Sequence, residues 1–307
     1  MSLIIEVSQV DKNYGTKQAL TGVEFSLNQG APVALVGPNG AGKTTLFSLL
    51  CGYIQPTSGS IKILGHSPGS SALFGHLSAL PQDAQLDPRF SIGTQLSFYA
   101  RLQGMSKALA KKDMQRVLDM VGLADVIDSQ PSELSHGMRK RATIAQALLG
   151  SPSIVMLDEA TAGLDPANAK EIRAIVAEHA NEVNFILSSH DLSELERLCD
   201  QVLYLEAGRL KQHQNLNSED SERYITLRMK QEYADIIPTL MTLPSLSNVT
   251  LTQDREYLLS IAAGQYTESY AASNSTSIEL ELLTLLQQKQ WSYAQLINGK
   301  TLENQLF

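Results

Sequence analysis

The segment "GPNGAGKTT" at residues 37–45 has the residue types and spacing of a polyphosphate-binding loop, G-x-x-x-x-G-K-[ST]. Glycines let backbone N–H groups approach phosphate oxygens, and the N-terminus of a following helix adds a positive dipole. Lys43 can reach the terminal phosphates, and the Thr44 hydroxyl can ligate Mg²⁺. The candidate nucleotide-binding residues of this loop are Gly37, Asn39, Gly40, Ala41, Gly42, Lys43, Thr44 and Thr45.

Two adjacent carboxylates close the apolar run "SIVMLDE" at residues 153–159. Asp158 stands where a Mg²⁺ carboxylate is needed opposite such a loop. Glu159 would then face the terminal phosphate and could polarise an attacking water. The pair could instead cap the next helix, but its presence beside a polyphosphate-binding loop favours nucleotide hydrolysis.

A third candidate is "ELSHGMRKRATIAQALL" at residues 133–149, predicted to be a helix with Ser135 as its N-cap. A phosphate at this helix N-terminus can be bound by the Ser135 hydroxyl, the backbone N–H groups and the helix dipole. Gly137 would keep the backbone approachable, and His136 and Met138 are expected to point away. The basic residues 139–141 are predicted to form a solvated helix face, with contact to a phosphate or a partner subunit as the second interpretation.

The elements that must position these residues alternate short β-branched runs with amphipathic helical patterns, which predicts an α/β fold with a largely parallel sheet. "PVALVG" at 32–37 and the run at 153–159 are continuously apolar, as expected for strands buried on both faces. From residue 93 to about 150 the pattern is helical, which predicts a helical insertion. We expect this domain to span residues 1–212.

The polar and acidic residues 213–222 are predicted to be a linker to a small α+β domain at 223–307. The patterns beyond it predict β-α-β-β-α-β, with the first helix in "QEYADIIPTLMTL", residues 231–243. Residues 215–307 carry six basic and eleven acidic side chains, a net charge of −5, which we interpret as a solvated acidic face.

Composition narrows the function classes. The 307 residues carry a net charge of −8, which argues against a broad nucleic-acid-binding surface. Cys51 and Cys199 lack metal-ligand spacing and are expected to be thiols in a reducing compartment. The apolar N-terminal run lacks a basic region before it, so a strand is predicted there and not a signal peptide. No run approaches the ~20 apolar residues of a membrane span, so a role at a membrane would be peripheral.

The ordered motifs of the chain resemble those of the ATP-binding cassette (ABC) ATPases. They are the P-loop at 37–45, "LSHGM" at 134–138, "VMLDE" at 155–159, "GLD" at 163–165 and "SSH" at 188–190. The resemblance covers residues 3–212 and implies a P-loop NTPase core with an inserted helical subdomain. It also implies ATP and Mg²⁺ as cofactors, and a head-to-tail homodimer with two ATP molecules. Each ATP would lie between the P-loop of one subunit and the signature segment (residues 134–138) of the other.

The same resemblance implies roles for single residues. Tyr14 looks like the aromatic that stacks on adenine, Gln82 like the glutamine that meets Mg²⁺ and water, and Asp165 like an aspartate that couples the two sites. His190 resembles the histidine that contacts the γ-phosphate. The expected catalytic residues are therefore Lys43, Gln82, Glu159 and His190. The expected metal ligands are Thr44, Gln82 and Asp158, and the nucleotide set gains Tyr14, Ser135 and Gly137.

The chain departs from the family pattern at three positions. His136 replaces the first signature glycine and Met138 the glutamine, while Ala160 stands where many relatives have proline. The resulting S-x-G-M signature and the C-terminal appendage resemble the ABC-2-type exporter branch. That resemblance implies a peripheral ATPase at the cytoplasmic side of the cell membrane that drives a separate permease. From the net charge we expect no nucleic-acid partner.

Two other functions remain open at this stage. One is a soluble ABC ATPase in iron–sulfur cluster assembly or another process without transport. The other is a regulatory cassette of low activity, for which the altered signature would be the mark, although Lys43 and Glu159 argue against it.

Overall fold

The computed structural model describes residues 2–190, 195, 198–199, 201–215, 224–261 and 278–298. The chain divides into two compact units, Met1–Asn215 and Leu216–Phe307, which are described separately.

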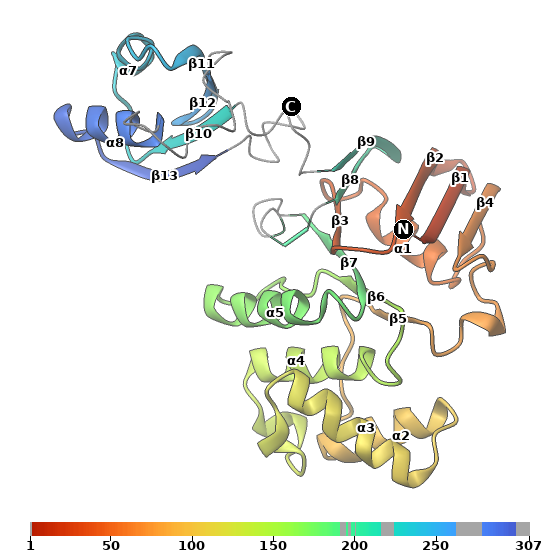
Figure 1. Ribbon diagram of the computed structural model, residues 1–307. Helices are drawn as coiled ribbons and strands as arrows, with labels where there is room; N and C mark the ends of the chain where they lie inside the picture. Colours follow the sequence, from red (N-terminus) through yellow and green to blue (C-terminus); the bar gives the residue numbers. More distant parts are fainter. Residues whose placement is uncertain are drawn as a thin grey trace. The chain divides into compact units, whose positions relative to one another are not determined.

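The first unit is built around a six-stranded sheet in the order β5-β6-β7-β3-β8-β9 (Figure 1). All neighbours are parallel except β9, which pairs antiparallel with β8. Every residue of β3 and β6 is buried, as their continuous apolar sequences predicted. The strands are β3 (Val33–Val36), β5 (Leu77–Leu80), β6 (Ile154–Asp158), β7 (Asn184–Ser189), β8 (Gln201–Glu206) and β9 (Arg209–Asn215).

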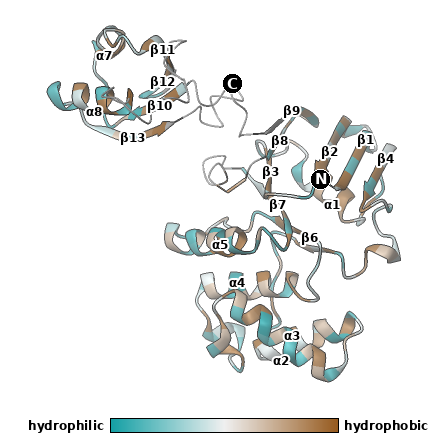
Figure 2. Ribbon diagram, in the orientation of Figure 1, coloured by the Kyte–Doolittle hydropathy of each residue, from teal (hydrophilic) through white to brown (hydrophobic). Residues whose placement is uncertain are grey.

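A second sheet of the first unit is antiparallel, in the order β2-β1-β4. Its strands are β1 (Leu3–Tyr14), β2 (Lys17–Asn28) and β4 (Ser58–Ile63). One core cluster joins apolar residues of these strands to helix α1 (Lys43–Leu50) and to the six-stranded sheet. Hydrophobic colouring is accordingly concentrated on the strands in Figure 2. This packing fixes the loop that precedes α1.

Residues 92–147 form the predicted helical insertion. Its helices are α2 (Ile92–Leu102), α3 (Lys107–Met120) and α4 (His136–Ala147), with 3-10 turns η2 (Ala124–Val126) and η3 (Pro131–Glu133). Each of the three α-helices begins after a serine whose hydroxyl accepts a hydrogen bond from a backbone N–H of the first turn. Helix α4 also contacts helix α5 (Pro166–His179), which follows β6 (Figure 1). A third 3-10 turn, η1 (Ser71–Leu73), precedes β5.

The second unit has the predicted order β-α-β-β-α-β. Its elements are β10 (Tyr224–Met229), α7 (Ile236–Leu240), β11 (Leu246–Gln253), β12 (Glu256–Ile261), α8 (Ile278–Gln288) and β13 (Tyr293–Asn298). The sheet order β11-β12-β10-β13 is antiparallel throughout, so each βαβ unit is split by a strand of the other. Its own core contains Trp291, which stacks on Tyr233.

Two predicted boundaries differ from the structure. The helix predicted over residues 231–243 is only Ile236–Leu240. Pro238 explains the shortening, since proline is tolerated only in the first turn of a helix and its ring clashes with the preceding turn. Strand β9 continues to Asn215, past the predicted domain end at 212, and residues 216–223 lie outside the described residues. None of the helices in the described part of the chain is long and apolar enough to span a membrane.

Candidate active site

The loop between β3 and α1 needs glycine both for its backbone conformation and for its close packing against neighbouring strands. Gly37, Gly40 and Gly42 have φ angles of 151°, 81° and 108°, which side chains rarely adopt. A Cβ built on Gly37 would lie 2.0 Å from the carbonyl oxygen of Leu205, and one on Gly42 would lie 2.8 Å from that of Ala19. Nothing lies within 4 Å of a Cβ built on Gly40. Two glycines are therefore required by packing against neighbouring strands, and the third faces open space.

The N-terminus of α1 suits an anion. Gly42 is the N-cap, and among the described residues no side chain hydrogen-bonds to this end of the helix. The first backbone N–H groups of a helix have no intrahelical acceptor, so here they can serve a phosphate.

The Lys43 side chain extends back from the start of α1 toward the loop. It is only 6% exposed, and its Nζ donates to the carbonyl oxygens of Gly37 (2.7 Å) and Pro38 (3.3 Å). Burial lowers the pKa of Lys43, while the charges of Glu159 and Asp158 raise it. An ammonium group has three donors, so one remains for a phosphate oxygen.

Asp158 is the last residue of β6 and is 4% exposed. The hydroxyl of Ser188, on the neighbouring strand β7, donates to its Oδ1. Burial raises the pKa of Asp158, and so does Glu159, while the Ser188 hydrogen bond and the charges of Lys43 and Lys140 lower it. The positive charges of Lys43 and Lys140 thus favour the ionised form of the buried Asp158 carboxylate, which burial disfavours.

Glu159 is the meeting point of the predicted catalytic residues. Its backbone has a φ of 45°, and its N–H donates to the carbonyl oxygen (3.2 Å) and Oγ (3.0 Å) of Ser188. Its Oε2 accepts a hydrogen bond from Nε2 of Gln82 at 3.2 Å, and its Oε1 lies 3.3 Å from Nδ1 of His190. Gln82, Glu159 and His190 follow β5, β6 and β7, which are neighbours in the parallel sheet, so their side chains converge at one edge.

The donor set at this edge fits Mg²⁺. Thr44 offers a hydroxyl, Gln82 an amide oxygen and Asp158 a carboxylate, which are the hard oxygen ligands that Mg²⁺ prefers.

The signature segment begins α4 as predicted, with Ser135 accepting from the N–H of Met138 at 3.2 Å. His136 is exposed and Met138 is half-buried. Gly137 has a role that the sequence did not reveal. A Cβ built there would lie 1.8 Å from Oδ1 and 2.3 Å from Cγ of Asn168, on helix α5.

Asn168 connects the signature segment to Asp165. Asp165 caps α5 by accepting from the N–H groups of Ala167 and Asn168, and the Asn168 side chain donates to its Oδ2. Any side chain at position 137 would therefore have to displace Asn168 of α5, a contact that no local sequence pattern indicates.

The predicted solvated face at residues 139–141 is wrong. Arg139 donates to the carbonyl oxygen of Leu134, and Lys140 to that of Gln82 at 3.3 Å. Arg141 donates to Val121 and pairs with Glu171 of α5 at 3.3 Å. The reason is that α4 packs against α2, α3, α5 and β5 and lines a cavity with the Q-loop segment (residues 81–88), so these side chains meet backbone carbonyls and Glu171 before they meet solvent.

Tyr14 lies at the end of β1 and is 49% exposed. The Nζ of Lys12 lies 5.2 Å from the centroid of its ring, a cation–π distance. The exposed ring can accept a planar base, and adenine stacking stays a prediction.

Comparison with known proteins identifies the family. Residues 20–162 match the model of the ABC transporter family. An uncharacterised ABC transporter ATP-binding protein of Bacillus subtilis is 33% identical over 232 residues, which cover 75% of this chain and 78% of the relative. The chain belongs to the ABC transporter family. The Nod factor export ATP-binding protein I of Burkholderia orbicola is 35% identical over 211 residues, 67% of this chain and 68% of the relative.

Solved structures of ABC cassettes share the fold of the first unit. The cbiO1 protein of Clostridium perfringens, part of the ABC transporter complex cbiONQ, superposes with a TM-score of 0.64 at 28% identity and covers 70% of this chain and 89% of that chain. A dimeric ATP-binding cassette bound to ADP and phosphate has a TM-score of 0.63 at 22% identity, covering 70% of this chain and 100% of that chain, which shows the same fold.

These findings confirm the predicted ABC family and the P-loop NTPase fold. The chain is an ATP-binding ATPase subunit of this family. Nothing in these matches points to iron–sulfur cluster assembly.

Proposed function

We propose that this ABC ATPase drives a separate membrane permease, at the cytoplasmic side of the membrane, and that the transporter is an exporter. The support for export is the relative named for Nod factor export, at 35% identity, together with the S-x-G-M signature of this chain. The support for a permease partner is that the neighbour cbiO1 is one part of a transporter complex.

The observation that carries the catalytic proposal is the convergence on Glu159. Gln82 and His190 each hold one oxygen of its carboxylate, at 3.2 and 3.3 Å. Each carboxylate oxygen keeps a further lone pair, so Glu159 can still accept a proton from a water. We assign Glu159 as the general base that activates the attacking water, with Gln82 and His190 orienting it.

The P-loop at residues 37–45, before and at the start of α1, binds the nucleotide. The N–H groups of α1 and the Lys43 ammonium bind the phosphates, and Tyr14 stacks on the adenine. Thr44, Gln82 and Asp158 would hold Mg²⁺, which would supply positive charge to neutralise the phosphate oxygens.

The active site is completed by a second copy of the chain in a head-to-tail homodimer. Ser135 is exposed at the N-terminus of α4, so its hydroxyl and the first N–H groups of the helix can meet an ATP held by a facing copy. The fold is shared with a cassette solved as a dimer after hydrolysis.

Replacement of the base tests the catalytic assignment. Glu159→Gln keeps the shape of the side chain and one of its two acceptor oxygens but removes its basicity, so we expect phosphate release from ATP to fall by about a hundredfold or more while ATP still binds. Glu178→Gln, an exposed glutamate on α5, is the matched control and should hydrolyse ATP like the wild type. Undiminished hydrolysis by Glu159→Gln would show that the base lies elsewhere.

A second experiment tests the transport role. Purification of the tagged full chain from detergent-solubilised membranes should recover a multi-span protein whose presence stimulates the ATPase activity. Recovery of iron–sulfur scaffold proteins alone would contradict the transporter assignment.

A further inference from the structure

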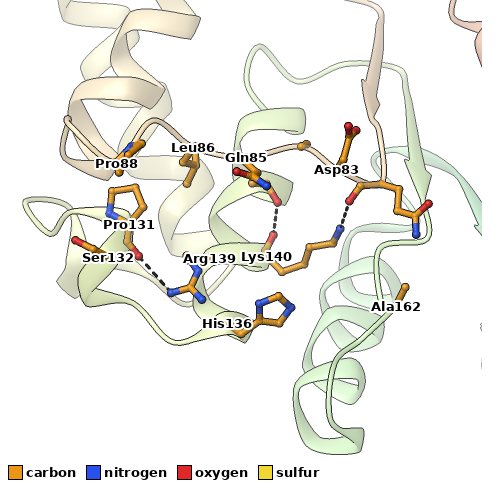
Figure 3. A pocket seen from close by; sticks show the side chains of 13 residues that line it. Asp83, Gln85, Leu86, Pro88, Pro131, Ser132, His136, Arg139, Lys140 and Ala162 are labelled. Atoms are coloured by element: carbon orange, nitrogen blue, oxygen red, sulfur yellow. Dashed lines mark hydrogen bonds between the residues drawn. The ribbon is translucent and has the colours of Figure 1, made fainter.

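Lys140 lies between the signature segment and the catalytic carboxylate of the same chain. Its side chain is half-buried in a cavity of about 500 Å³ that the Q-loop segment and α4 line together (Figure 3). Its Nζ donates to the carbonyl oxygen of Gln82 at 3.3 Å. In Figure 3 this bond is the dashed line that starts at the side-chain nitrogen of Lys140. The acceptor is main chain, so the bond fixes the backbone of the Q-loop segment itself.

Gln82 makes two different contacts, one through its backbone carbonyl oxygen and one through its side-chain amide. While Lys140 binds its carbonyl oxygen, its Nε2 donates to Oε2 of Glu159 at 3.2 Å. The position of the Gln82 backbone decides where its amide group can reach. Lys140 therefore acts on Glu159 through one intervening residue.

The charges around Lys140 favour this position. Burial lowers the pKa of Lys140, and the charges of Asp158, Asp83 and Glu159 oppose that effect. Lys43 and Lys140 both place a positive charge near the Asp158 carboxylate at the end of β6. A lysine on an ordinary solvated face would have none of these partners.

The backbone of α4 is anchored next to Lys140. Thr143 donates to the Lys140 carbonyl oxygen at 2.7 Å, and Arg141 pairs with Glu171 of α5. Lys140 follows Ser135 by five residues on the same helix, about 7.5 Å along its axis. A shift of the first turn of α4 would thus carry Lys140 with it.

We propose that Lys140 is a positioning residue that connects the signature helix of each copy to the Gln82–Glu159 pair of the same copy. The inference rests on the proposed dimer, in which Ser135 of one copy meets the ATP held by the other. Engagement of that ATP sets the position of α4, and Lys140 passes this position to the Glu159 of its own site. The two sites of the dimer then communicate through this lysine.

Hydrogen exchange in the nucleotide-free full chain tests the contact alone. Lys140→Met keeps an unbranched apolar stem as far as Cε but removes the ammonium donor. It should raise exchange of the backbone amides in residues 83–87 by roughly fivefold, the factor that one hydrogen bond commonly contributes. Lys140→Arg, which keeps a donor, should exchange more slowly than Lys140→Met, and the exposed Lys111→Met should match the wild type. Unchanged exchange in Lys140→Met would overturn the proposal.

Mixed dimers test the direction of the effect. Full-length copies with different tags are combined so that one carries Glu159→Gln, which leaves a single working base in the other copy. Lys140→Met in the copy with the intact Glu159 should lower kcat by roughly fivefold with little change in KM. The same change in the Glu159→Gln copy should leave kcat unchanged.

Loss of kcat in the other mixed dimer would contradict the proposal. A loss of kcat from Lys140→Met in the Glu159→Gln copy would mean that Lys140 acts on the ATP of the facing subunit, and the proposal would be wrong. Failure of the homodimer itself would leave the exchange experiment unaffected, because that measurement needs neither nucleotide nor a second copy.

Discussion

Substitution of Gly137 by alanine distinguishes a packing role from a phosphate-approach role. The added methyl carbon would lie 1.8 Å from Oδ1 and 2.3 Å from Cγ of Asn168, and 3.0 Å from its Cβ. Carbon contacts are favourable only at about 3.5–4.0 Å, so Asn168 must rotate and α4 must also shift slightly. Rotation breaks the hydrogen bond from Asn168 to Asp165. Overpacking of this kind costs about 1–3 kcal/mol of unfolding free energy.

Thermal unfolding of the full chain, followed by far-UV circular dichroism, measures this loss. Fluorescence of Trp291, the single tryptophan of the chain, reports on the second unit and should not change. Asn168→Ala removes Oδ1 and Cγ, so the double variant Gly137→Ala with Asn168→Ala should recover most of the lost stability. We expect ATP hydrolysis to recover with it, since the displaced Asp165 and α4 return together.

Two results would refute the packing argument. One is a Gly137→Ala variant as stable as the wild type. The other is a double variant no more stable than Gly137→Ala alone. Lost hydrolysis with unchanged stability would instead mean that Gly137 serves the approach of a phosphate, as the sequence alone indicated.

Three further predictions concern the buried groups and the metal. Burial raises the pKa of Asp158 above its unfolded value of 3.8, so its ionised form opposes folding at neutral pH. Asp158→Asn should therefore increase the free energy of unfolding by about 0.5–2 kcal/mol, seen as a higher thermal unfolding midpoint, and should abolish hydrolysis. The gain in stability should vanish as the pH falls below 3.8, because Asp158 is then protonated in both the folded and the unfolded state. An unchanged gain at low pH would rule out ionisation as its cause. Burial raises the pKa of Cys51 to about 12, so iodoacetamide at pH 8, read by mass spectrometry, should label Cys51 at least roughly a hundredfold more slowly than a free thiol. Chelation of Mg²⁺ by EDTA should stop phosphate release and leave the unfolding midpoint of the nucleotide-free protein unchanged, and continued hydrolysis would contradict the metal assignment.

Local patterns predicted the elements that carry the site. The apolar runs before the P-loop and before Asp158 predicted β3 and β6, because a strand buried on both faces is apolar along nearly its whole length. Serine before an amphipathic stretch predicted the start of α4. The family resemblance then indicated which strand-end residues meet at Glu159.

Contacts between segments that are distant in the sequence could not be predicted from local patterns. Nothing local connects Gly137 to Asn168, or Lys140 to the carbonyl oxygen of Gln82, since each pair meets only after packing brings α4 against α5 and the Q-loop segment. The same packing explains why residues 139–141 are not a solvated face. Pro238 did give a local signal, and its restriction to a first turn would have shortened the helix predicted at 231–243.

The central claim is that each ATP site is formed by two copies of this chain. A complementation assay with Lys43→Ala and Ser135→Arg tests it most directly, once circular dichroism has shown that both variants are folded. Neither variant alone should hydrolyse ATP, because every site would lack either its P-loop lysine or its signature. A mixed dimer contains one intact site, so an equal mixture should recover about a quarter of the wild-type rate. A mixture as inactive as its components would contradict a site shared between two copies.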